Sequence, residues 1–158
     1  MSEDARFEDG REAPLRLKAL DADDLQVISA LVQDSVLPAS EMTFKRKDRR
    51  FAVLLNRFRW EDAPNAERRK RDYERVQSVL VIEDVTAVRS AGVSRDADTV
   101  MSLLSVGFEP AEDGTGTVRL VLAGDGEIEL AVEALEVVLK DVTRPYVAPS
   151  HKAPAHPE

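Results

Sequence analysis

The chain has 158 residues, and its 30 Asp and Glu outnumber its 22 Lys and Arg, which gives a formal net charge of −8 at pH 7. A chain of this length can bury a hydrophobic core as one domain without support from metals or disulfides. It contains no cysteine, which excludes disulfides, thiolate nucleophiles, iron–sulfur clusters and Cys-ligated zinc. The only histidines, His151 and His156, lie in a Pro-rich terminal stretch, so we expect no histidine catalysis in the core.

The first part of the chain predicts an arm, a strand and a helix. Residues 1–14 are polar and charged without a hydrophobic period, and we expect them to form a disordered arm. Apolar and basic residues alternate over 15–20, which predicts a short strand with one buried face. Asp21 can cap the helix that follows, and Pro38 discourages its continuation. The apolar stripe of this helix consists of Leu25, Ile28, Leu31, Val32 and Val36.

A β-hairpin is predicted over 41–60, with a charged turn and a long return strand. Near the end of that strand, aromatic and basic residues alternate. The alternation predicts that Phe58 and Trp60 pack on the core, while Arg57 and Arg59 lie on the opposite, solvated face.

The remaining chain is rich in strand patterns, with a change of period at the end. Residues 61–74 read as a charged loop that could equally carry a short polar helical turn. β-Branched residues and turn signals predict strands over 76–82, 85–89, 100–108, 117–122 and 127–132. From 132 to 139 the apolar residues fit one face of a helix, so we predict a C-terminal helix.

These elements together predict an α+β fold. We expect a curved, mostly antiparallel sheet or a partly closed barrel of about seven or eight strands, with one early helix and one C-terminal helix. The predicted single domain covers residues 15–144. A Pro-rich disordered tail is expected over 145–158.

Charge is segregated along the chain. Twelve of the 22 basic residues and six of the 30 acidic residues lie between Lys45 and Arg75, so this basic island carries +6 and the remainder −14. A concentrated basic surface within an acidic protein can attract an anionic partner. The candidate partner-binding residues are Lys45, Arg46, Lys47, Arg49, Arg50, Arg57, Arg59, Arg68, Arg69 and Arg71.

No catalytic, metal or cofactor site is predicted. The glycine pairs at 114 and 116 and at 124 and 126 lack the spacing of phosphate loops, and they indicate hairpin turns instead. No apolar run approaches the roughly 18 residues that a membrane span requires. Because the acidic start leads to no apolar signal segment, we expect a cytoplasmic protein with no membrane partner.

Four segments carry a resemblance to a known family. They are the helix from Leu25 to Val36, the run Phe-Ala-Val-Leu-Leu-Asn-Arg-Phe-Arg-Trp-Glu at 51–61, the segment Leu103 to Pro110, and the end from Gly126 to Tyr146. Together they resemble a family of short bacterial proteins catalogued as domain-of-unknown-function family 2948, over most of residues 15–146. The resemblance implies a bacterial cytoplasmic protein and assigns no catalytic residue.

We therefore expect a non-enzymatic interaction or scaffold protein, which forms a homodimer and contacts an acidic protein surface through the basic hairpin and loop. The alternative is an RNA- or polyanion-binding module that uses the same residues. A third interpretation is a solvated edge whose arginines pair with neighbouring acidic residues such as Glu61, Asp62 and Glu67. An enzyme that uses Asp, Glu, Arg and Lys alone is the fourth.

Overall fold

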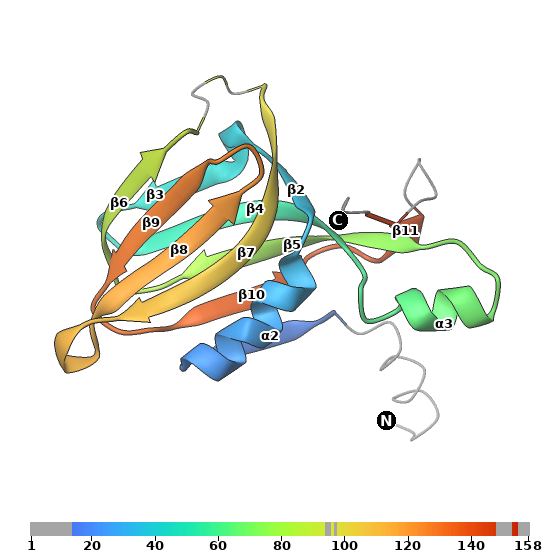
Figure 1. Cartoon of the computed structure of the whole chain (residues 1–158), viewed down its shortest axis with the longest axis horizontal. Coiled ribbons are helices and arrows are strands. Elements are labelled where there is room, and N and C mark those ends of the chain that lie inside the picture. The colour runs from blue at the N-terminus through green and yellow to red at the C-terminus, as the bar shows by residue number, and fades with distance from the viewer. Residues whose placement is uncertain (1–13, 94–95, 97, 148–152, 155–158) are drawn as a thin grey trace.

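A computed structural model describes residues 14–93, 96, 98–147 and 153–154. Figure 1 shows a strongly curved sheet with helix α2 against it and the short helix α3 to one side. The first half of the chain forms β1 (Arg16–Ala19), α2 (Ala22–Val32), β2 (Ser35–Pro38), β3 (Met42–Lys45), β4 (Arg50–Phe58), α3 (Ala63–Arg68) and β5 (Glu74–Ile82). The second half forms β6 (Val85–Ala91), β7 (Val100–Pro110), β8 (Gly116–Leu122), β9 (Glu127–Val132), β10 (Val137–Asp141) and β11 (Tyr146–Val147). Two single turns of 3-10 helix, Ala39–Glu41 and Glu112–Gly114, complete the described elements.

One sheet contains all eleven strands of the described part of the chain, in the order β1-β10-β5-β4-β2-β7-β8-β9-β6. β3 pairs with β4, and β11 pairs with β5. All of these pairs are antiparallel. The prediction of a curved antiparallel α+β fold is confirmed, but the strand count exceeds the predicted seven or eight.

Helix α2 begins and ends for local reasons. Asp21 is its N-cap, and the Asp21 side chain accepts a hydrogen bond of 2.8 Å from the Asp24 amide. Leu25, Ile28 and Val32 are buried, and the helix lies against β7. The predicted apolar stripe wrongly included Val36, which lies in β2 and pairs with Asn56 of β4.

The predicted C-terminal helix is wrong. Residues 137–141 form β10, which lies between β1 and β5 in the sheet. Val137 and Leu139 are fully buried on one face of that strand, with Asp141 two residues further along. The same apolar residues fit both a helical and an alternating pattern, and pairing with strands on both sides stabilises the extended form.

The charged stretch after β4 contains α3, which is the short helical turn that the sequence had left open as an alternative to a loop. Pro64 lies at its start, where the missing proline N–H costs no hydrogen bond, and Ala66 is its buried residue. β4 itself ends at Phe58, two residues before the predicted end of the strand.

Both predicted terminal segments fall largely outside the described residues. Nearly all of the predicted arm, residues 1–13, and most of the predicted tail, 148–152 and 155–158, lie there. The sheet does reach into the predicted tail, since Tyr146 and Val147 pair with Arg75 and Glu74 of β5.

Candidate functional site

The ten predicted partner-binding residues do not form one surface. β4 separates them, and its nine residues span about 26 Å at the usual rise of about 3.3 Å per residue. Residues 45–50 lie at the start of β4, whereas the α3 segment follows its end (Figure 1). The basic island is therefore divided into two separate groups.

At the hairpin end, two of the five basic residues are held in ion pairs. Arg50 contacts Glu83 at 3.0 Å, and Arg49 contacts Glu133. Lys45, Arg46 and Lys47, which we call the hairpin tip, are exposed. The Arg46 guanidinium carbon lies 5.7 Å from the centre of the Phe44 ring, within the range of a cation–π contact.

Arg57 is not on a solvated face, as the sequence had predicted, because its side chain is fully buried. It continues the inward row of β4 that begins with Phe51, Val53 and Leu55. Burial of a guanidinium requires nearby anions, and the fold supplies two carboxylates. We therefore leave Arg57 out of any contact surface.

The two carboxylates hold Arg57 from different elements. Asp141 of β10 accepts hydrogen bonds at 3.1 and 3.0 Å from Nε and Nη2, in the bidentate arrangement that arginine favours. Glu61 accepts two more, from Nη1 and Nη2, each at 2.9 Å. Ser78 of β5 accepts from Arg57 Nε at 3.1 Å and donates to Asp141 at 2.6 Å. This network fastens the end of β4 to β5, to β10 and to the start of the α3 segment.

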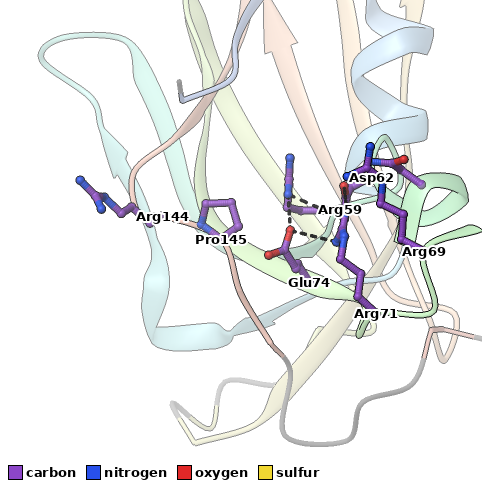
Figure 2. A pocket seen from close by; sticks show the side chains of 8 residues that line it. Arg59, Asp62, Arg69, Arg71, Glu74, Arg144 and Pro145 are labelled. Atoms are coloured by element: carbon purple, nitrogen blue, oxygen red, sulfur yellow. Dashed lines mark hydrogen bonds and ion pairs between the residues drawn. The ribbon is translucent and has the colours of Figure 1, made fainter. Parts of the chain in front are cut away.

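An open pocket of about 470 Å³ lies beside this network (Figure 2). We call it the arginine pocket. Among the described residues, four arginines and two carboxylates line it: Arg59, Arg69, Arg71, Arg144, Asp62 and Glu74. Its lining therefore has a formal charge of +2, in a protein with a net charge of −8.

Two of the four arginines are fixed by the carboxylates. Arg71 donates to both oxygens of Asp62, at 2.8 and 2.5 Å. Arg59 forms an ion pair with Glu74, and Arg71 is 3.8 Å from the same carboxylate. Figure 2 shows the Glu74 side chain between the two guanidinium groups. These side chains form the ordered centre of the pocket.

The other two arginines have no carboxylate partner within the described residues. Arg69 follows the last residue of α3, and Arg144 precedes β11. Both are exposed, and they lie on opposite sides of the fixed centre (Figure 2). A guanidinium with free donors binds carboxylate or phosphate oxygens through paired hydrogen bonds. The pocket can therefore bind an anion without first breaking its internal ion pairs.

Aromatic side chains lie near the pocket but do not line it. Phe58 is buried, with ring centres 4.6 Å from Trp60 and 5.5 Å from Tyr73. Trp60 Nε1 donates to the carbonyl oxygen of Gln33 at 2.9 Å, which ties this loop to the end of α2. Phe58 is buried as predicted, but Trp60, which was predicted to pack on the core with it, is only half-buried, and neither ring belongs to the main hydrophobic core cluster. None of the described residues that line the pocket carries an aromatic ring on which a base could stack.

Sequence reasoning missed Arg144 and the carboxylates that organise the pocket. Arg144 lies more than 60 residues after the basic island, and the pairing of β11 with β5 brings it close. No local pattern around residue 144 indicates that pairing. Asp62 and Glu74 were visible as neighbours of the basic residues, but their contacts with Arg59 and Arg71 depend on the turn that α3 makes.

A family model matches residues 15–156, which is most of the chain and includes every residue of the arginine pocket. The chain belongs to the family described as protein of unknown function (DUF2948). The resemblance found in the sequence is thereby confirmed. No match to this DUF2948 protein was found among curated proteins or solved structures.

Two further findings concern this DUF2948 protein. None of the helices in the described residues is long and apolar enough to cross a membrane. Across the same residues, no three histidine or carboxylate side chains gather closely enough to hold a metal ion. The partner-binding role of the predicted basic residues remains a prediction.

The carboxylates of the site should make the fold sensitive to acid. Hydrogen bonds from Arg71 hold the pKa of Asp62 below its ordinary value. Burial raises the pKa of Glu61, but the hydrogen bonds and charge of Arg57 outweigh it, so the pKa of Glu61 is also lowered. Both carboxylates therefore stabilise the fold above their unfolded pKa of about 4, and this stabilisation is lost as pH falls through the folded pKa.

We expect the free energy of unfolding to fall as pH is lowered below about 5, with part of the slope missing in Asp62→Asn. Urea unfolding at several pH values between 7 and 3 measures this. Asp98→Asn, at an exposed loop position away from the pocket, is the matched control and should keep the full slope. An unchanged slope in Asp62→Asn would show that the Arg71 contact does not lower the pKa of Asp62.

Proposed function

We propose that this protein is a non-enzymatic interaction module that binds an acidic segment of a partner protein in the arginine pocket. The observation that carries the proposal is the pair Arg69 and Arg144, which lie on opposite sides of a fixed centre and have no carboxylate partner in the described residues (Figure 2). An extended acidic segment can satisfy both arginines at once. The acidic partner is another cytoplasmic protein or a second copy of this chain, whose net charge is −8.

A protein partner is favoured over nucleic acid for two reasons. Single-stranded nucleic acids are usually bound by basic grooves in which bases stack on aromatic rings, and the rings near this pocket are buried or hydrogen-bonded to other groups. The net charge of −8 also opposes the approach of a polyanion. Binding of RNA through the same residues is the alternative function.

The proposal predicts that Arg69→Glu with Arg144→Glu weakens binding of an acidic peptide by about 10- to 100-fold. The reason is that hydrogen bonds to charged groups contribute roughly 1.5–3 kcal/mol each. The probe is a labelled peptide of about ten Glu and Asp residues, and fluorescence anisotropy gives the Kd. Trp60, the only tryptophan and the neighbour of Arg59, gives a second signal from the protein itself.

The matched control is Lys45→Glu with Lys47→Glu, which changes the net charge equally at the hairpin tip. This control should bind the peptide nearly as well as the wild type. Equal loss in both variants would show that binding follows net charge and not the pocket. A labelled single-stranded RNA at about 50 mM salt tests the alternative, which requires an affinity that falls steeply as salt is raised.

The protein-binding function and the RNA-binding alternative can then be compared by capturing partners from native cytoplasm with and without nuclease. Partners lost on nuclease treatment would favour the RNA function. Light scattering of the wild type and the Arg69→Glu with Arg144→Glu variant tests whether the pocket also mediates self-association.

A further inference from the structure

We infer that Glu74 determines the specificity of the arginine pocket, because this resident carboxylate keeps acidic ligand groups out of the centre and confines them to Arg69 and Arg144. The inference rests on the proposed function, since it names the kind of acidic segment that the same pocket takes. That segment carries two separated acidic groups with uncharged residues between them. An acidic cluster of the same charge is a poorer ligand.

The centre of the pocket is already neutral. Arg71 donates to both oxygens of Asp62. Glu74 contacts Arg59 and lies 3.8 Å from Arg71, and Figure 2 shows it between these two guanidinium groups. The two arginines and the two carboxylates cancel in formal charge. The charge of +2 on the lining therefore comes from the two flanking arginines.

Glu74 is the carboxylate of this centre that an incoming ligand meets first. Its side chain is 26% exposed, against 11% for Asp62. A ligand carboxylate at the centre would lie against this like charge. It would also have to replace Glu74 on guanidinium groups that an intramolecular carboxylate already holds at a high effective concentration. A site that repels one arrangement of charge and attracts another discriminates between ligands of equal net charge.

The flanks of the pocket have the opposite character. Arg69 and Arg144 are exposed, and neither has a carboxylate partner in the part of the chain that the structure describes. Each guanidinium can bind one acidic group through paired hydrogen bonds. Because the fixed centre lies between the two arginines, two separated acidic groups fit them better than one compact anion (Figure 2).

The first test compares ten-residue peptides of identical composition, each with four acidic residues and six serines. In the split peptides, two acidic pairs are separated by two, four or six serines, and in the clustered peptide the four acidic residues are consecutive. We expect the best split peptide to bind the wild type about tenfold more tightly than the clustered peptide, because it gives both arginines a charged acceptor. Fluorescence anisotropy gives each Kd. Equal affinities would overturn the inference and leave the proposed function intact.

The variant Glu74→Gln tests the residue itself. It removes the central charge at nearly the same shape and releases Arg59 from its ion pair. We expect the clustered peptide to bind this variant about tenfold more tightly than it binds the wild type, and the split peptide to gain less than about threefold. An equal gain for both peptides would show that Glu74 acts only through net charge, and it would overturn the inference.

The matched control is Glu83→Gln. Glu83 is 23% exposed and pairs with Arg50 at 3.0 Å at the hairpin end, so this change also removes one negative charge and releases one arginine. It should leave the ratio of the two peptide affinities unchanged. A change in that ratio as large as the change in Glu74→Gln would overturn the inference.

Two further outcomes separate the inference from the proposed function. If the peptide of ten acidic residues binds through Arg69 and Arg144 but no split peptide does, the inference alone fails. If none of the peptides binds the wild type, the proposed function fails and the inference fails with it. Circular dichroism checks that Glu74→Gln is folded, and the comparison of peptides on the wild type does not depend on that variant.

Discussion

Arg57→Ala should lower the free energy of unfolding by about 3–5 kcal/mol, which is the usual effect of removing one partner from a buried ion pair. The side chain of Arg57 is fully buried, and its loss leaves Asp141, at 7% exposure, without a positive charge. Ser78 would keep one hydrogen bond to that carboxylate. Urea or guanidinium denaturation followed by circular dichroism measures the change.

Arg50→Ala is the matched control, because Arg50 has a carboxylate partner at 3.0 Å but lies in solvent. It should change stability little, since exposed ion pairs are screened by water and salt. The double variant Arg57→Leu with Asp141→Leu should be more stable than Arg57→Ala, because no unpaired charge stays buried. If the double variant were less stable than Arg57→Ala, the contacts of Arg57 and Asp141 would contribute more to stability than the compensation of each other's buried charge.

Phe58→Ala should cost about 3–5 kcal/mol, the range for truncating a buried aromatic side chain. Phe58 is 1% exposed and packs against Trp60, and the guanidinium of Arg75 lies 5.9 Å from its ring centre. For a chain of this size the loss corresponds to a drop of about 6–20 °C in Tm. The emission of Trp60 should also move to longer wavelength as water reaches the indole, so one thermal melt with fluorescence detection measures both effects.

Val27→Ala provides the comparison for that experiment. Val27 lies on α2 with 54% of its surface exposed, and alanine favours a helix more than valine does. We expect a change in unfolding free energy within about 0.5 kcal/mol and no shift in emission. If Phe58→Ala behaved like Val27→Ala, the packing beneath the arginine pocket would not be the close contact that the ring distances indicate.

Elements with a local signal were predictable from the sequence. The capping side chain of Asp21 and the apolar stripe after it specified α2, and β-branched runs specified most strands of the sheet. β10 was not predictable, since the apolar residues over 132–139 satisfy two periods. What decides between them is hydrogen bonding to β1 and β5, whose partner residues are more than 50 positions away in the chain.

The candidate site was also hard to predict, because its contacts join residues that lie far apart in the sequence. The alternating pattern of β4 correctly placed Arg57 and Phe58 on opposite faces of the strand. Both faces of β4 are covered by other parts of the chain at that point, so Arg57 is buried as well as Phe58. Its partners Glu61 and Asp141 come from different parts of the sequence. The arginines after α3 were found from composition alone, whereas the place of Arg144 depends on the return of the chain along β5.

β11, the strand that follows Arg144 and pairs with β5, has only two residues. The two sides of the pocket are therefore held by different numbers of paired residues. Arg59 and Glu74 stand where β4 and β5 pair along eight consecutive positions. Arg144 lies between two short attachments to β5, which are the hydrogen bonds of Val142 and Thr143 to Gln77 and the pairing of Tyr146 and Val147. Short elements with few paired residues open at low free-energy cost. We therefore expect the Arg144 side of the pocket to deform more readily than the side formed by β4 and β5, and the amides of β11 to exchange with solvent long before those of β5.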